Sequence, residues 1–351
     1  MGVLEAILVF IVVVLFLVVS HELGHFLTAK WFSVRVDELG VGLPPRAFGI
    51  KRGETLYSIN WLPFGGFVRM FGEDEDEGKD DPRSFSSQGM GIKSLIVASG
   101  VIANVLVGFL ILSYIAWHGV PHFEVAIEEV VSGTPAELAG FQIGDRIVGF
   151  EGKRLKSVNV GEVHQYIDSK RGKQAEFLVR RDSQDLHIFA GPRAHPPEGQ
   201  GPLGVRIDNI QTEIVRESFF MAPLAGAEMT GNFLKLIMEG TVAFLGSIVT
   251  GAEMPGEVVG PIGIAGVAQE TFRVGVHEFL FLIALLSLHL AVINILPIPA
   301  LDGGRIAFFA VEKIIRRPIP PRVAGSIHSV FFLVLVGFLL WVSWHDIARF
   351  I

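Results

Sequence analysis

The sequence predicts an α-helical membrane protein with four transmembrane helices, a membrane-associated β-hairpin and a small α+β domain inserted between the second and third spans. Two observations lead to this fold class. The chain of 351 residues is 50% hydrophobic, with a mean hydropathy of +0.50, which is far more apolar than an ordinary soluble domain. Four segments approach the roughly 20 apolar residues that cross a bilayer, namely Val3–Val19, Leu95–Trp117, Phe279–Ile298 and Ile327–Trp344.

The first region, residues 1–120, holds the first two spans. Its N-terminal segment lacks the basic start and the small-residue cleavage site of a signal peptide, so we expect it to be retained. Residues 54–72 (ETLYSINWLPFGGFVRMFG) predict a β-hairpin, with one strand on each side of the Pro-Phe-Gly-Gly turn. A plain cytoplasmic cap is the alternative role for this hairpin.

Three titratable side chains follow the apolar part of the first span. His21 and His25 lie four residues apart, so on a helix they share a face and can reach one metal ion. Glu22 is placed to take the proton of a water that the metal activates, as in the H-E-x-x-H pattern of zinc hydrolases. Such groups are costly in lipid, which favours a functional role. The alternative is a pair of interfacial histidines that cap a membrane helix.

A third metal ligand is expected elsewhere, because a catalytic zinc takes three protein ligands. The chain has no cysteine, so the ligand must be His, Asp or Glu. Asp302, in NILPIPALDGG, follows the third span. Pro297 and Pro299 break the helix before it, which at membrane depth is tolerated only where the chain is buried or lines a wet cavity. Asp302 is therefore the candidate that completes the histidine pair.

The remaining regions differ in pattern. Residues 121–210 contain short apolar runs separated by glycine-containing turns, which predict a small β-rich domain. Residues 211–275 predict amphipathic helices at the membrane surface, with packing against the spans as the alternative. Residues 276–351 hold the last two spans and the Asp302 motif.

Basic residues predict the orientation of the chain. Lysine and arginine gather in residues 30–93 and 305–322, so both loops should face the cytoplasm. Both metal half-sites then lie at cytoplasmic ends of spans, while the termini and residues 121–210 lie outside. The net charge of −7 argues against a nucleic-acid partner, for which a basic stripe would be expected.

These motifs together carry a family resemblance. H-E-x-x-H at the end of a first span, with N-x-x-P-x-P-x-L-D-G-G after a later one, resembles the site-2 protease family of intramembrane zinc metalloproteases. The segments GFVRM, GPIGIA and LDGGRIAFFAVEKI are similar to its bacterial regulator-of-sigma-E branch, and the similarity covers nearly the whole chain. The resemblance implies a Zn²⁺ cofactor held by His21, His25 and Asp302, with Glu22 as the general base.

The resemblance also implies a substrate class and a location. The expected substrates are single-span membrane proteins such as anti-sigma factors or signal-peptide remnants, cut within or near their span in the bacterial inner (cell) membrane. The hairpin resembles a membrane re-entrant β element whose free edge holds the substrate extended. The residues expected to bind substrate are Asn294, Pro297, Pro299, Gly65, Gly66 and Phe67.

The inserted region 121–210 resembles an extracytoplasmic PDZ domain, most clearly in TPAELAGFQIGDRIVGFEG. It is expected either to capture a substrate terminus near Leu203-Gly204-Val205 or to act as a bulky filter. Two departures from the branch are present. The chain has room for one such domain where the branch usually has two, and Val101 stands where proline is usual.

Two other functional classes compete with the protease. One is a catalytically inactive membrane scaffold that binds partners through the PDZ-like domain and in which the metal has only a structural role. The other is a metal transporter, which would need polar groups along a crossing path. Glu22 favours the enzyme over the scaffold, since a structural metal site needs no base.

Overall fold

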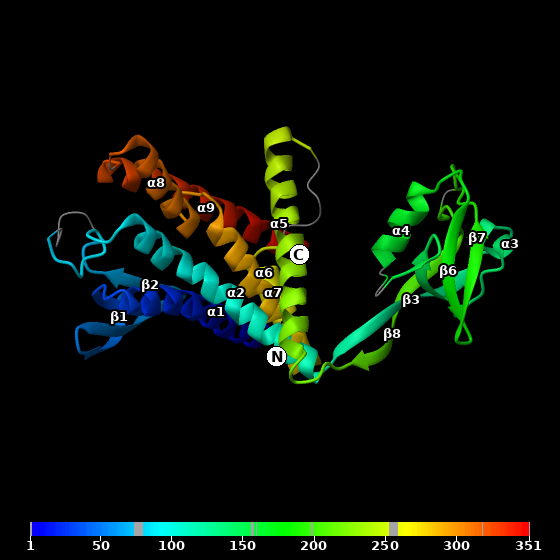
Figure 1. The fold of residues 1–351 in the computed structure, drawn as a ribbon, viewed down its shortest axis with the longest axis horizontal. Helices are drawn as coiled ribbons and strands as arrows, with labels where there is room; N and C mark the ends of the chain where they lie inside the picture. The colour runs from blue at the N-terminus through cyan, green and yellow to red at the C-terminus, as the bar shows by residue number, and fades with distance from the viewer. Residues whose placement is uncertain are drawn as a thin grey trace. The chain divides into compact units, whose positions relative to one another are not determined.

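The computed structural model describes residues 2–73, 80–155, 158, 160–197, 199–252, 259–317 and 319–350. The chain divides into two compact units, which are described separately (Figure 1). The membrane unit consists of Met1–Trp117 and Ser218–Ile351, and the inserted unit of His118–Glu217.

Helices dominate the membrane unit. They are α1 (Val3–Trp31), α2 (Met90–His118), α5 (Ala222–Thr250), α6 (Pro261–Val274), α7 (Val276–Ile295), α8 (Asp302–Ile315) and α9 (Pro321–Phe350). Within the described residues, five helices are long and apolar enough to cross a membrane: α1, α2, α5, α7 and α9. The four predicted spans lie in α1, α2, α7 and α9. The count of four is not confirmed, because α5 is a further candidate where surface helices were expected.

Helices α1 and α2 pack closely and antiparallel. Ser20 approaches Asn104 at 3.5 Å between Oγ and Oδ1, and one turn further along α1, Gly24 lies against the backbone of Ser99. A methyl group on Gly24 would overlap the Ser99 carbonyl, so glycine is what allows the two backbones to approach.

Helix α7 packs antiparallel to α2 and therefore runs parallel to α1. Ser287 Oγ donates to the Asn104 carbonyl at 2.8 Å, and a Cβ on Gly108 would lie 2.7 Å from Leu288 Cδ2 and 3.5 Å from the Ala284 carbonyl oxygen. The C-terminal ends of α1 and α7 consequently lie at the same end of the membrane unit. This direction brings the histidine motif of α1 near the segment that follows α7.

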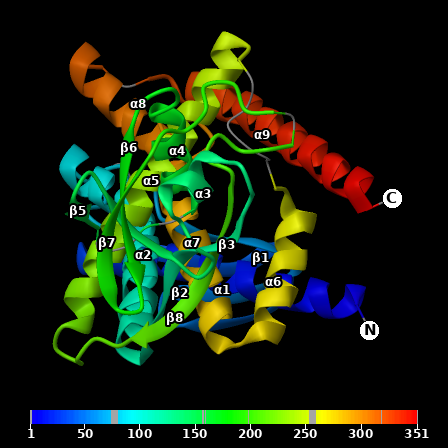
Figure 2. The same cartoon turned by 90° about the vertical axis from the view of Figure 1, so that its right-hand side faces the viewer.

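Helix α6 lies beside α1 and is tied to α9 (Figure 2). Asp346 of α9 is buried, and its carboxylate accepts hydrogen bonds from the amides of Gly260 (3.1 Å) and Gly263 (2.9 Å). Those amides belong to the start of α6, where unpaired N–H groups and the helix dipole favour a carboxylate. The GPIGIA segment thus serves as a helix start capped from another helix.

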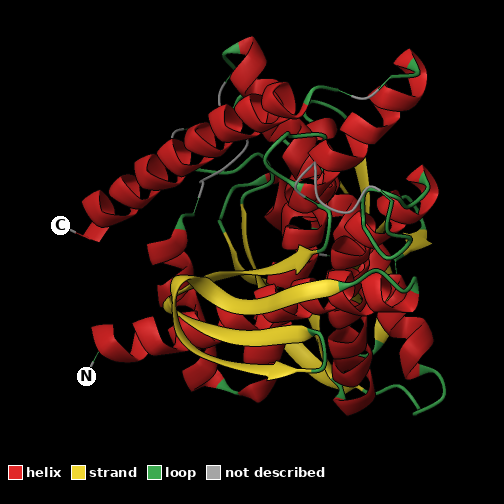
Figure 3. Cartoon of the chain, turned by 90° about the vertical axis from the view of Figure 1, so that its left-hand side faces the viewer, coloured by secondary structure: helices red, strands yellow, loops and turns green. Residues whose placement is uncertain are grey.

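Strands β1 (Val36–Arg52) and β2 (Thr55–Met70) form an antiparallel sheet beside α1 (Figure 3). The turn between them is at Gly53, with φ of 62°. The predicted hairpin is wrong in its partner and its turn: Pro63–Gly66 lies inside β2, and β2 pairs with β1, for which no strand was predicted. Gly65, with φ of 82°, bends the strand there instead of ending it.

The sheet has a free outer edge near α1. Residues 38–41 of β1 have neighbours on both sides, since they meet residues 56–59 as well as residues 66–69. Residues 66–70 are therefore an outer segment, and among the described residues no further strand pairs with it.

In its described residues, the inserted unit is a single antiparallel sheet with two helices. Its strands follow the order β7-β6-β4-β3-β8, with β5 on β4. The elements are β3 (Val120–Val130), α3 (Pro135–Ala139), β4 (Arg146–Phe150), β5 (Lys153–Arg154), α4 (Val160–Ser169), β6 (Ala175–Arg181), β7 (Gln184–Ala190) and β8 (Val205–Val215). A core around the fully buried Phe177 fills the unit. Strand β8 runs past Ile210, where the sequence placed the boundary.

Candidate metal centre

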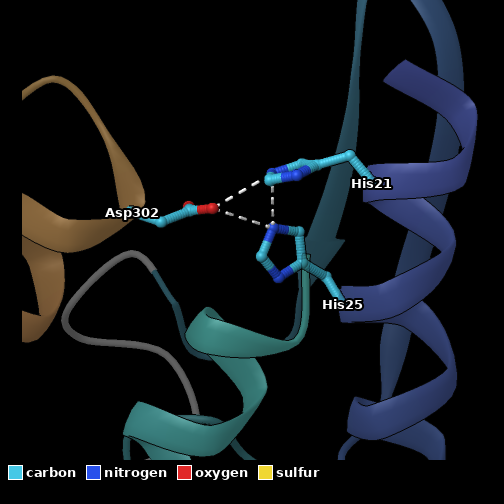
Figure 4. Close-up of side chains that lie close together, drawn as sticks. All are labelled: His21, His25 and Asp302. Carbon is cyan, nitrogen blue, oxygen red and sulfur yellow. Dashed lines mark hydrogen bonds and ion pairs between the residues drawn. The ribbon is translucent and has the colours of Figure 1, made fainter. Parts of the chain in front are cut away.

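Three side chains that bind metals meet where α1 and α8 approach each other (Figure 4). His21 Nε2 and His25 Nε2 are 3.1 Å apart. Asp302 Oδ2 lies 3.0 Å from the first of these atoms and 3.4 Å from the second. The histidines are one turn apart on α1, and the aspartate is the first residue of α8.

The three atoms fit the ligand set of a zinc ion. Zinc bonds of 2.0–2.2 Å in a tetrahedron separate neighbouring ligand atoms by about 3.3 Å, which is close to the separations found here. Within the described part of the chain, the buried Asp302 Oδ2 has no hydrogen-bond partner. A buried carboxylate oxygen is costly without a partner, and a cation among these atoms would supply one.

The charge state of Asp302 suits a ligand. Burial raises the pKa of Asp302, but the adjacent His21 and His25 imidazoles lower it by more, so this pKa lies well below its ordinary value. The carboxyl also stands in the first turn of α8, where the helix dipole favours an anion. Asp302 is therefore ionised at neutral pH.

The turn between α7 and α8 holds Asp302 in place through close backbone packing. A side chain on Gly303 would overlap the carbonyls of Ile295 and Leu296, and one on Gly304 would overlap that of Ile298. The two glycines of the D-G-G motif thus let the first turn of α8 lie directly on the end of α7.

Helix α2 packs against both histidines of the centre. His25 Nδ1 lies 2.8 Å from the Ile96 carbonyl oxygen, so it donates there and leaves Nε2 to face the other two ligand atoms. Gly100 lies next to both imidazoles: a Cβ there would be 2.5 Å from His25 Nε2 and 2.7 Å from His21 Nε2.

The predicted general base lies beside the free edge of β2. A Cβ on Gly66 would lie 3.0 Å from Glu22 Cγ and 2.9 Å from Val18 Cγ1, so strand and helix touch at this point. Within the described residues, the Glu22 carboxylate accepts no hydrogen bond. Glu22 is therefore available to a proton donor that arrives between α1 and the strand edge.

The other predicted site residues lie near the centre without joining it. Asn294 is in the last turn of α7, and Pro297 and Pro299 are in the turn before α8, where the Pro299 carbonyl accepts a hydrogen bond from His328 Nδ1 at 2.9 Å. Phe67 packs against Gly40, whose Cβ would overlap its ring. Their roles toward substrate, like that of Gly65, stay predictions.

Sequence reasoning missed two features of the centre. The first is the face of α2 that carries Gly100. The spacing of Gly100 and Asn104 in SGVIAN is the sequence signal for this face, but it does not say which other span the face packs against. The second is an ion pair between Arg305 of α8 and Glu73 beyond β2, at 2.5 Å. Glu73 also accepts from the Met70 amide at 3.2 Å, so it ties the end of β2 to the helix that carries Asp302.

Comparison with known proteins agrees with this geometry. The profile of peptidase family M50 matches residues 9–338. A protein of Clostridium perfringens named as a zinc metalloprotease is 30% identical over 94% of this chain and 95% of its own length. The zinc metalloprotease RasP of Geobacillus kaustophilus is 27% identical over 99% of both chains. The regulator of sigma-W protease RasP of Bacillus subtilis is 26% identical over 98% of this chain and 99% of its own. The chain therefore belongs to peptidase family M50, the site-2 protease family, and is a multi-pass membrane zinc metalloprotease.

Proposed function

We propose that this protein is an intramembrane protease that hydrolyses peptide bonds within or near the transmembrane segment of single-span membrane proteins. The observation that carries the proposal is the meeting of His21, His25 and Asp302 beside Glu22. The first two and Glu22 lie in the C-terminal part of the apolar helix α1, and Asp302 follows the apolar helix α7. The Bacillus subtilis relative is named for regulating a sigma factor. By that analogy, the substrates here are anti-sigma factors or remnants of signal peptides.

The chain's own residues divide the reaction among them. When bound, zinc supplies a Lewis acid and an acidified water at neutral pH. His21, His25 and Asp302 would hold it. Among the described residues no further ligand belongs to this group, and three protein ligands would leave room for water or substrate. Glu22 accepts the proton of the attacking water and delivers it to the leaving amine, which is the task of a general acid–base group within reach of both atoms.

The edge of β2 presents the substrate in an extended form. A transmembrane helix keeps its carbonyls in internal hydrogen bonds, so it must unwind before attack. Residues 66–70 offer backbone partners to an unwound segment by strand addition, and Gly66 places that edge against Glu22. Asn294, Pro297 and Pro299 lie at the broken end of α7, and we propose that polar groups there also contact the unwound segment.

The direction of the helices supports a cytoplasmic metal centre. Basic residues flank both ends that carry ligands, in residues 30–93 and 305–322, and such loops stay in the cytoplasm. Because α1 and α7 run the same way, α2 ends and α7 begins on the opposite side. The inserted unit, which follows α2, is then extracytoplasmic in the bacterial inner membrane.

The test is cleavage of a single-span substrate by the full chain in liposomes, before and after removal of zinc with a chelator. Chelation is expected to lower the rate by at least about 10²-fold, and added zinc to restore it.

N-methylation of substrate amides around the cut removes donors needed for strand addition and is expected to slow cleavage. Cleavage that survives chelation, or that maps far outside the span, would contradict the proposal. Bound zinc with no cleavage of any trimmed substrate would favour the scaffold.

The inserted unit is proposed to be PDZ-like and to capture a peptide carboxyl terminus. It has a hollow of about 200 Å³ between α4 and the start of β8, lined by His164, Arg171, Leu203, Gly204 and Val205 among others. Gly204 has φ of 80° and lies against Thr134, so its amide belongs to a tight loop of the kind that binds carboxylates.

Capture through a carboxylate makes a direct prediction for peptide binding. A peptide with a free C-terminus is expected to bind the full chain at least about tenfold more tightly than the same peptide with a C-terminal amide, because the amide removes the charge that the loop amides would receive. Fluorescence anisotropy of the two labelled peptides measures the difference. Equal binding, or none, would leave the unit as a filter that excludes bulky substrates.

A further inference from the structure

One face of α2 meets both histidines of the metal centre. Ile96, Gly100 and Asn104 follow one another at intervals of four, so they form a single stripe on the helix. The Ile96 carbonyl accepts from His25, and Gly100 leaves room for both rings. Asn104, at the end of the stripe, faces the remaining ring nitrogen of His21: its Nδ2 lies 3.3 Å from His21 Nδ1.

Asn104 is built into the interior of the membrane unit. Its exposed fraction is 0%, and its own carbonyl accepts from Ser287 Oγ of α7 at 2.8 Å. A buried amide side chain is costly without partners. Among the described residues, its side-chain partners are His21 Nδ1, 3.3 Å from Nδ2, and Ser20 Oγ, 3.5 Å from Oδ1.

The hydroxyl of Ser20 decides which way the Asn104 amide points. A serine has one proton to donate, and Ser20 donates it to the Leu17 carbonyl at 2.8 Å. Ser20 Oγ can therefore only accept from Asn104, which requires the NH₂ group on the side of Ser20. The structure places Asn104 Nδ2 toward His21 Nδ1 and Oδ1 toward Ser20 Oγ. The two ends of an amide are nearly alike in shape and are assigned from the hydrogen-bond network. The network here assigns the reverse orientation, in which the amide oxygen faces His21 Nδ1.

We propose that Asn104 is a positioning residue of the metal centre, which accepts the Nδ1 proton of His21 and so directs Nε2 of that ring toward zinc. The inference rests on the proposed zinc site of His21, His25 and Asp302 and deepens it. Both histidines are then held alike, His25 by the Ile96 carbonyl and His21 by the Asn104 amide oxygen. Outer partners of this kind fix the tautomer and the ring plane of a metal-binding histidine.

A purely structural role for Asn104 makes a different prediction. An asparagine side chain that only packs between α1 and α2 would affect stability but not the affinity of the centre for zinc. Asn104→Leu removes the acceptor at similar volume. Asn104→Asp keeps an acceptor oxygen at the same place and cannot donate, so it separates acceptance of the His21 proton from packing.

The experiment measures zinc affinity of the purified full chain in detergent by competition with a chromophoric chelator, together with the visible spectrum of the Co²⁺ form. Asn104→Leu is expected to bind zinc about 10- to 100-fold more weakly and to change the Co²⁺ bands. Asn104→Asp is expected to stay within about threefold of the wild type. Ser113→Ala is the matched control and should change neither reading. It removes a hydroxyl of α2 that, among the described residues, donates to the Phe109 carbonyl of its own helix.

Each other outcome is decisive. Wild-type affinity in Asn104→Leu would overturn the proposal, and so would an Asn104→Asp variant as weak as Asn104→Leu, since packing would then explain both. His21→Ala separates this inference from the site itself: it should lose the zinc. A wild-type chain that binds no zinc, or a His21→Ala variant that binds it fully, would overturn the metal assignment and this inference together.

Discussion

Replacing Glu22 with glutamine is expected to abolish cleavage and to leave the zinc content unchanged. Glutamine has nearly the same size, but its amide cannot take a proton from water. General acid–base groups contribute about 10²- to 10⁴-fold to a rate. The cleavage rate of the variant should therefore be at least about 10²-fold below that of the wild type. Among the described residues, no hydrogen bond or ion pair joins the Glu22 carboxylate to His21, His25 or Asp302, so zinc should stay bound. Single-turnover cleavage in liposomes and metal analysis of the same sample measure the two quantities.

A second glutamate on the same helix provides the control. Glu5 lies near the start of α1 and pairs with Arg273 of α6, far along the helix from the histidines. Glu5→Gln should keep both zinc and cleavage. If Glu22→Gln cleaves at the wild-type rate, Glu22 is not the base. If it loses zinc together with activity, Glu22 acts through the metal site and its role as a proton carrier is not supported.

The spans and the ligand set could be predicted because each depends on a local pattern. An apolar run of spanning length has few alternatives to a membrane helix, and the helix period alone places His21 and His25 on one face. Asp302 needed one more step, since its meeting with the pair depends on α1 and α7 running in the same direction. The charge distribution predicted that direction, and the packing of both helices against α2 agrees with it.

The strands were harder to predict because their partner was not evident. Residues 36–52 contain two prolines and three glycines, which count against a strand. They form β1 nonetheless, because pairing with β2 supplies the backbone partners that local propensity does not. The Pro-Phe-Gly-Gly segment has the composition of a turn, yet Gly65 bends a continuing strand and Gly66 allows a close approach to α1.

Helix α5 illustrates the limit of a hydropathy argument. Its 29 residues are long enough to span, but Glu228, Lys235 and Glu239 interrupt its apolar surface, and Lys235 and Glu239 pair along the helix at 3.8 Å. Length favours a span, and the charges favour a surface position. Because α2 ends on the side where α7 begins, a crossing by α5 would require the chain to cross back before α7.

Replacing Gly100 with alanine is expected to destroy the metal centre, although this residue has no side chain that could take part in chemistry. The new methyl group would lie 2.5 Å from His25 Nε2 and 2.7 Å from His21 Nε2, which is closer than non-bonded atoms approach. At least one imidazole must turn away, and His25 would lose its bond to the Ile96 carbonyl if its ring rotates. Loss of one ligand should weaken zinc binding by at least about 10²-fold and end cleavage with it.

Alanine in a helix is otherwise favoured over glycine by about 1 kcal/mol. A loss of zinc binding in Gly100→Ala could therefore not be explained by a weaker helix. Gly91→Ala is the matched control: it lies on the same helix, and a Cβ there would meet nothing within 4 Å. Gly91→Ala should keep zinc and activity and be slightly more stable. Zinc affinity and cleavage are measured for both variants beside the wild type. A Gly100→Ala protein that keeps full zinc affinity would mean that α2 can move away from the histidines. The close contact at Gly100 would then not be required for the metal centre.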